Sequence, residues 1–353
     1  MQQRLVSLDG LRTLSILIVL FAHLSITKNF PASNVPVESI LTGDMGVNIF
    51  FVISGFLITL LLLKEENTKG EINIKHFYIR RIFRILPVYY FFLATCFLCL
   101  NFKIVPDILI DSFIPPLTFT TGTLPIKTGW TLGHTWSLSI EEQFYLIWPA
   151  LLICIKKKRN RNILLIFIIS ITPVARILYY YHFRDLSYMF ILRGDCLMMG
   201  CLLAINKDMI QLFYQKIKAK YLVGISIFSI SLLLNYLSSS GSMGSVTIPL
   251  TFFLHGILGV YLIVANTLTI SNKNLFSRFL NLKPVVYLGK LSYSLYIWQQ
   301  FFLQNRTTAI SGVKLFPINI VLVFIVGYLS YRLIETPVLK LKDRIARPAV
   351  SVA

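Results

Sequence analysis

The sequence predicts an all-α fold, that of a polytopic integral membrane protein with about ten transmembrane helices and both termini in the cytoplasm. Of its 353 residues, 56% are hydrophobic and only 14% are charged, whereas a soluble domain carries about a quarter charged residues. A soluble protein of this composition could not cover its surface with polar groups. The apolar residues also gather into runs of about 20, the length of helix that crosses a bilayer.

Ten such runs follow one another along the chain, separated by short polar segments. They lie at residues 10–27, 46–63, 82–101, 137–155, 162–181, 187–206, 221–237, 249–270, 287–303 and 315–334. An even number of spans places both chain ends on the same side of the membrane. We therefore predict one transmembrane domain over residues 5–337, followed by a short basic cytoplasmic tail at 338–353.

The distribution of Lys and Arg sets the orientation of these spans. With the N-terminus inside, 26 of the 34 basic residues fall on cytoplasmic segments and 8 on outer ones, as the positive-inside rule requires. The formal net charge of +19 then needs no nucleic acid partner, and the basic run at 156–161 is interpreted as a cytoplasmic anchor. We predict a multi-pass protein of the cell (inner) membrane, surrounded by membrane lipids. The five cysteines lie in apolar runs without metal-ligand spacing, so we expect no metal.

Ionisable side chains inside the spans are costly, so each one is a candidate functional residue. In the first span, Arg12 and His23 are eleven positions apart, which returns a helix to within roughly 20° of the same direction. The two side chains therefore share one helix face, about 16 Å apart along the axis, with Asp9 near the same stripe. A histidine that is hydrogen-bonded within a helix interface is the open structural alternative for His23.

The fourth and sixth spans add charged side chains at a similar depth. Glu142, which follows Glu141, lies about 9 Å into the fourth span. A neutral histidine beside a carboxylate is the arrangement of a general base, and we predict Glu142 as the partner of His23. Arg193 and Asp195 lie in the outer half of the sixth span. They either support the same site or form a buried pair that neutralises itself.

Two arginines near the start of the third span predict an anion site. Arg81 and Arg84, at i and i+3, project from one side of a helix. Guanidinium pairs match phosphate oxygens bidentately, although anchoring at the cytoplasmic surface is an open alternative. A phosphate-bearing donor with a long flexible arm could bind there and present its reactive end about 16 Å deeper, near His23. An acyl thioester of coenzyme A fits this geometry.

Six segments, in order along the chain, resemble the membrane-bound acyltransferase family 3. They read LDGLR at 8–12 with His23, GDMGVNIFFVISGFLI at 43–58, RIFR at 81–84, WSLSIEEQFY at 136–145, LGKLSYSLYIW at 288–298 and ETP at 335–337. The enzymes of this family O-acylate surface polysaccharides, peptidoglycan, lipids and small glycosides. The resemblance covers essentially the whole chain, from about residue 5 to residue 337.

The resemblance implies an O-acyltransferase in which His23 is catalytic and Arg12 assists it. It implies that Arg81 and Arg84 contact the phosphates of the donor, acetyl-CoA or another acyl-CoA. The acyl group, most often acetyl in this family, would pass from the cytoplasmic donor to a hydroxyl of a cell-surface or lipid-linked carbohydrate. The acceptor partner is thus a carbohydrate or glycolipid.

This chain departs from the family pattern after Trp298, where many relatives carry histidine. Here the position holds Gln299, which can hydrogen-bond but cannot titrate, so a mechanism that uses a second histidine is not expected. Glu335 is predicted to be a structural partner for Arg332 or for helix packing. We do not expect the added extracytoplasmic domain that some family members carry.

Two other classes of function stay open at this stage. A proton-coupled transporter of an anionic solute or glycolipid would also use intramembrane His, Glu, Asp and Arg. It would show a pseudo-symmetric repeat with paired broken helices, and the sequence shows none. A non-catalytic scaffold would leave His23 and Glu142 without a role that offsets their insertion cost. We therefore expect the acyltransferase.

Overall fold

The computed structural model describes residues 6–31, 37–183, 189–240, 244–268, 275–304 and 311–345. The longer helices are α1 (Val6–Ser25), α3 (Gly43–Lys69), α4 (Ile74–Asn101), α7 (Thr135–Cys154), α8 (Lys158–Phe183), α10 (Asp195–Ile205), α11 (Lys207–Lys216), α12 (Lys220–Ser239), α13 (Gly244–Ile263), α15 (Lys283–Phe302), α16 (Ile318–Ser330) and α17 (Thr336–Ile345). The short ones are α2 (Val37–Ile40), α5 (Ile114–Leu117), α6 (Gly129–Gly133), α9 (Phe190–Arg193) and α14 (Leu275–Leu280). These ranges contain no strand, which confirms the all-α prediction.

The helices identify a multi-pass membrane protein, but they do not confirm ten spans. Within the described ranges, seven helices are long and apolar enough to cross a membrane, or eight if the pair α10 and α11, bent by 86°, counts as one span. Helices α7 and α15 reach 20 residues each but are too polar to be counted with them. Large apolar side chains such as Phe167 and Leu222 lie exposed on the helix surfaces, as expected of a face in contact with lipid. The count of ten and the cytoplasmic termini stay predictions.

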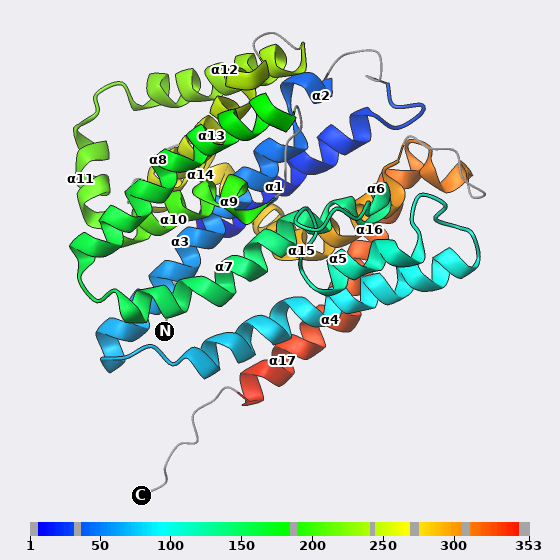
Figure 1. The fold of residues 1–353 in the computed structure, drawn as a ribbon, viewed down its shortest axis with the longest axis horizontal. Coiled ribbons are helices and arrows are strands. Elements are labelled where there is room, and N and C mark those ends of the chain that lie inside the picture. Colours follow the sequence, from blue (N-terminus) through cyan, green and yellow to red (C-terminus); the bar gives the residue numbers. More distant parts are fainter. Residues whose placement is uncertain are drawn as a thin grey trace, which may run out of the picture.

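Helices α1 and α3 pack against each other at the centre of the bundle (Figure 1). On one side, α3 packs against α10 and α13, which in turn contact α8 and α12. On the other side, α1 packs against α15, followed by α16, and α15 also contacts α4. Apolar side chains on the two central helices, among them Leu11, Ile16, Ile49 and Phe51, are almost completely buried. The central pair therefore carries the core and faces both halves of the bundle.

Glycines bring the backbones of neighbouring helices into direct contact. A Cβ on Gly55 of α3 would lie 2.0 Å from the carbonyl oxygen of Leu197 in α10. A Cβ on Gly200 of α10 would lie 2.2 Å from the carbonyl oxygen of Val52 in α3. Small residues allow such close packing in a membrane, where helices associate without a hydrophobic driving force. The pair α3 and α10 is therefore held at a distance that only glycine permits.

One residue of the basic run at 156–161, Arg161, is buried and forms an ion pair. The guanidinium of Arg161 is buried and donates two hydrogen bonds to the Glu66 carboxylate, at 3.0 and 2.8 Å. It also donates to the carbonyl oxygen of Leu152, at 2.6 Å. Arg161 thereby ties the end of α3 to the junction of α7 and α8, while the other basic residues of the run are exposed.

The segment predicted as a short tail begins inside a helix. Residues 338–345 belong to α17, which packs against α4. Residues 346–353 lie outside the described part of the chain.

The glycine contact between α3 and α10 gives a test of the packing. We expect Gly200→Ala to lower the midpoint of thermal unfolding of the purified protein in detergent, because overpacking against a backbone costs about 1–3 kcal/mol or more. Gly312→Ala is the matched control, since a Cβ there has no neighbour within 4 Å. Equal midpoints for the two variants would contradict the close approach.

Candidate active site

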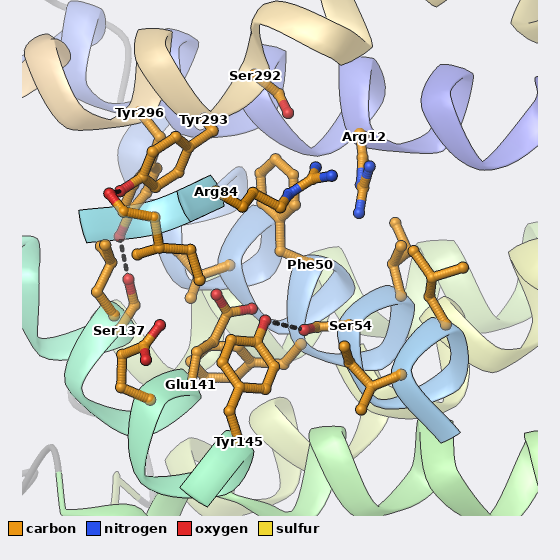
Figure 2. A pocket seen from close by; sticks show the side chains of 18 of the residues that line it. Arg12, Phe50, Ser54, Arg84, Ser137, Glu141, Tyr145, Ser292, Tyr293 and Tyr296 are labelled. Atoms are coloured by element: carbon orange, nitrogen blue, oxygen red, sulfur yellow. Dashed lines mark hydrogen bonds between the residues drawn. The ribbon is translucent and has the colours of Figure 1, made fainter. Parts of the chain in front are cut away.

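Three arginines and two glutamates line a cavity of about 100 Å³ among the central helices (Figure 2). Arg12 comes from α1, Arg81 and Arg84 from α4. Glu141 and Glu142 come from α7. We call this the arginine cavity. It brings together all five of these residues, which sequence analysis had selected from three separate segments.

Two arginines of the arginine cavity contact neighbouring side chains on α1 and α7. The Arg12 Nη1 atom lies 3.6 Å from Asp9 Oδ1. The Arg81 guanidinium lies over the Tyr145 ring, 5.1 Å from its centroid, and the Tyr145 hydroxyl hydrogen-bonds to the Ser54 hydroxyl at 2.6 Å. The Oε1 atom of Glu142 is buried and has no hydrogen-bond partner. Three guanidinium groups and two carboxylates thus line the cavity, and guanidinium groups are suited to an anionic ligand.

A second and larger cavity, of about 850 Å³, contains His23 in its lining. We call it the histidine cavity. Its other polar and aromatic lining includes Asp44 of α3, Trp130 of α6, His134 before α7, and Gln300 of α15. This volume lies in the range of small-molecule sites, about 300–1,000 Å³.

The His23 imidazole is held by an amide oxygen. Its Nδ1 atom lies 2.6 Å from Gln299 Oε1. A carbonyl oxygen only accepts, so Nδ1 carries the proton and donates, and Nε2 keeps its lone pair. A Cβ on Gly43 would lie 3.2 Å from that Nε2 atom, and the Trp130 ring lies 5.2 Å from the imidazole, centroid to centroid. The basic nitrogen therefore faces the first turn of α3.

The predicted pairing of His23 with Glu142 is wrong. The hydrogen-bond partner of His23 is Gln299, and Glu142 lines the other cavity. The reason is depth: α1 ends at Ser25, so His23 lies in its last turn, whereas Glu142 lies about 10 Å into α7 from its start at Thr135. Gln299 thus takes the orienting position that was assigned to a carboxylate.

The carboxylate that shares the cavity of His23 is Asp44, which sequence analysis did not select. Asp44 lies in the first turn of α3, a favourable place for an acidic side chain at a helix N-terminus. Its Oδ1 atom lies 3.6 Å from Nη1 of Arg193. The sequence did carry a sign of a helix start here, because Thr42 is a favoured N-cap residue and Asp44 follows two positions later. In the structure Thr42 caps α3 by accepting a hydrogen bond from Met45 N.

The alternative that Arg193 and Asp195 neutralise each other is also wrong. Asp195 forms a buried salt bridge with Arg176 of α8. The Arg193 guanidinium lies 3.9 Å from the centroid of the Phe252 ring and pairs with Asp44. Arg193 and Asp195 therefore pair with different helices: one contact joins α9 to α3 and the other joins α10 to α8.

His134 is a second imidazole in the histidine cavity that sequence analysis missed. It is almost completely buried, its backbone N–H donates to Gln300 Oε1 at 2.8 Å, and its Nδ1 atom lies 3.1 Å from the same oxygen. The adjacent glutamines Gln299 and Gln300 thus hold the two histidines of this cavity. His134 lies three residues before the fourth predicted span, and its closeness to that span was a signal that the sequence offered.

Glu335 is hydrogen-bonded to a neighbouring helix rather than paired with Arg332. It is buried, and its Oε2 atom accepts a hydrogen bond from the Ser294 hydroxyl at 2.9 Å. Ser294 belongs to α15. Glu335 therefore ties the segment before α17 to the helix that carries Gln299.

The two cavities adjoin on shared helices. Val47 of α3 and Tyr296 of α15 line both of them. On α1, Arg12 lines the arginine cavity and His23 the histidine cavity. The arrangement places the three arginines and the His23 imidazole in two neighbouring cavities that share part of their lining.

A family model described as an acyltransferase domain matches residues 5–331. The chain belongs to this acyltransferase family. This confirms the resemblance recognised in the sequence motifs. O-acetyltransferase OatA of Staphylococcus aureus (strain NCTC 8325 / PS 47) is 28% identical over 373 aligned residues, which cover 94% of this acyltransferase chain and 57% of the relative. The putative O-acetyltransferase SACOL0978 of Staphylococcus aureus (strain COL) is 30% identical over 365 residues, with 94% and 56% covered.

The acyltransferase chain therefore spans little more than half the length of these relatives. No solved structure shows a significant match to it.

The salt bridge between Arg176 and Asp195 predicts a strong effect on stability. We expect Asp195→Asn to destabilise the protein by about 3–5 kcal/mol, because it leaves a buried guanidinium without its counter-charge. Thermal unfolding of the purified variant in detergent measures this loss. Asp208→Asn, at an exposed position of α11, is the matched control. Equal unfolding midpoints for Asp195→Asn and Asp208→Asn would show that the ion pair between Arg176 and Asp195 has no structural role.

Proposed function

We propose that this chain is a membrane O-acetyltransferase that moves an acetyl group from acetyl-CoA to a hydroxyl of a carbohydrate or glycolipid acceptor at the cell membrane. The observation that supports the proposal is the meeting of two cavities, one lined by three arginines and one containing His23. The names of the two relatives, both O-acetyltransferases, support acetyl as the acyl group.

The arginine cavity is the proposed donor side. Arg12, Arg81 and Arg84 supply guanidinium groups that match phosphate oxygens in charge and in geometry. Coenzyme A carries its phosphates far from its thioester, along a flexible arm. A donor held by these arginines could therefore direct the thioester toward Val47 and Tyr296, where the cavities meet. We place the arginine cavity on the cytoplasmic side, where acyl-CoA is found.

The histidine cavity is the proposed acceptor side. Its volume of about 850 Å³ is sufficient for a sugar unit. Trp130 and Trp136 offer aromatic surfaces, and Asp44 offers a carboxylate that can accept hydrogen bonds from hydroxyls. This combination of apolar faces and a few fixed polar groups suits a carbohydrate acceptor.

His23 is the proposed general base. Its Nε2 atom takes the proton from the acceptor hydroxyl as the oxygen attacks the thioester carbonyl. The C–S bond then breaks, and the imidazolium returns the proton to the departing thiolate. Gln299 holds the Nδ1–H of His23 throughout, so that Nε2 is the reacting nitrogen. Transfer through an acyl-His intermediate would use the same nitrogen.

Mass spectrometry of the O-acyl groups on the surface glycans of the source cell tests this proposal. We compare cells with the intact gene, cells from which it is deleted, and deletion cells that express the wild-type chain, His23→Ala or His182→Ala. His182 is the matched control because it is exposed at the end of α8. We expect deletion of the gene to remove one fixed acyl mass from the glycan. We expect the same loss with His23→Ala, because loss of a general base lowers the rate of transfer by about 10²–10⁴-fold. Retention of that mass in the His23→Ala strain would overturn the assignment of the base.

The donor side is tested by removing its guanidinium groups. We expect Arg81→Ala combined with Arg84→Ala to raise KM for acetyl-CoA by about tenfold or more, because each lost hydrogen bond to a charged group is worth about 1.5–3 kcal/mol. Arg80→Ala is the control, since Arg80 pairs with Glu65 at 3.6 Å and does not line the cavity. An unchanged KM in the double variant would show that the two arginines only anchor α4.

A further inference from the structure

We propose that Val47 determines which acyl group this enzyme transfers, because its side chain limits the space at the point where the donor and acceptor cavities meet. The inference rests on the proposed function. It adds the residue that would select acetyl over longer acyl groups.

The position of Val47 on α3 marks the boundary between the two cavities. Asp44, one turn before it, lines only the histidine cavity, and Ser54, two turns after it, lines only the arginine cavity. Gly43, which faces His23 Nε2, lies four residues before Val47 and therefore about 6 Å away along the helix axis. Val47 is thus one helical turn along α3 from the residue that faces the proposed base.

Helix α15 gives the same order of residues from the opposite side of the site. Tyr293 lines only the arginine cavity, Tyr296 lines both cavities, and Gln300 lines only the histidine cavity. Two helices that lie on different sides of the site therefore place the boundary at the same level. The boundary is formed by one residue from each, Val47 and Tyr296.

Tyr296 is fixed in its place, as its hydroxyl contacts show. The hydroxyl hydrogen-bonds to Ser137 Oγ at 2.6 Å and lies 3.2 Å from the carbonyl oxygen of His134, to which it donates. The ring is packed at its edge against the His134 imidazole, with 5.5 Å between centroids. Since both contacts would be lost if the ring turned away, the free space at the boundary depends on the other residue that lines both cavities, Val47.

The chemistry of transfer brings the acyl carbons to this boundary. The thioester arrives from the arginine cavity and the acceptor hydroxyl from the histidine cavity, so the carbonyl under attack lies where the two meet. The acyl carbons must then be accommodated against Val47 and Tyr296, which are only 6% and 8% exposed. An added methylene in such a packed site changes the rate of transfer by about 10-fold or more.

The test compares two donors that differ by one methylene. Membranes from source cells that lack the native gene and express each variant receive radiolabelled acetyl-CoA or propionyl-CoA, and the alkali-labile label on the glycan fraction is counted. The measured quantity is the ratio of propionyl to acetyl transfer. Because both donors are assayed on the same membranes, the amount of folded protein cancels from this ratio.

We expect Val47→Ala to raise the propionyl-to-acetyl ratio by about tenfold, and Val47→Ile to lower it. Val52→Ala is the matched control: Val52 is fully buried on the same helix but lines neither cavity, since it packs on α10 and α13. Its ratio should equal that of the wild type.

Wild-type ratios in both variants at position 47 would overturn the inference and leave the proposed function standing. A ratio that rises equally in Val52→Ala would also overturn it, because the effect would then be general loosening of α3. A wild-type chain that transfers neither acyl group would overturn the proposed function itself, and the inference with it.

Discussion

The backbones of α1 and α15 meet where Gly289 leaves no room for a side chain, since a Cβ there would lie 1.9 Å from the Asp9 carbonyl oxygen. From this contact the two helices run in the same direction to the hydrogen bond between His23 and Gln299. The contact lies one turn from Arg12, so it also positions the α1 end of the arginine cavity. The close approach of these two helices therefore brings Gln299 to His23 and places α15 beside the arginine cavity.

The buried charges of the protein divide into two groups with different roles. Arg161, Arg176 and Asp195 form paired contacts that join helices, and the pairing offsets the cost of burying them. The charged groups of the arginine cavity instead line open space, although Arg12 also lies 3.6 Å from Asp9. A guanidinium that lines a cavity is available to a ligand in a way that one within a bidentate ion pair is not. This difference separates the groups that hold the bundle together from those that we assign to the donor.

Features that depend on a single helix, such as the spacing of side chains along one face, could be predicted from the sequence. Contacts that depend on how two helices pack could not. The spacing of Arg12 and His23 is a local property of α1, and the structure places the two at neighbouring cavities as that spacing implies. The spacing of Arg81 and Arg84 is likewise local to α4. The partner of His23 depends on α15 lying beside α1, and no pattern within either segment shows that contact.

The partners of Arg193 and Asp195 illustrate the same limit. The two residues are close in sequence, and a pairing between them was the simplest assumption. A break between α9 and α10 at Gly194 separates them, and each finds its counter-charge on a different helix. The predicted number of spans likewise rests on apolar runs alone. Helices α7 and α15 are not apolar enough to be counted, because several of their polar residues line the two cavities.

We propose that an acyl group crosses from the arginine cavity to the histidine cavity within this one chain. This transfer is measured with the purified full chain in sealed vesicles, with radiolabelled acetyl-CoA outside and glycan acceptors from the source cell inside. We expect alkali-labile label on the enclosed glycan, and its loss with His23→Ala. Label that appears only on glycan added to the same side as the donor would contradict it.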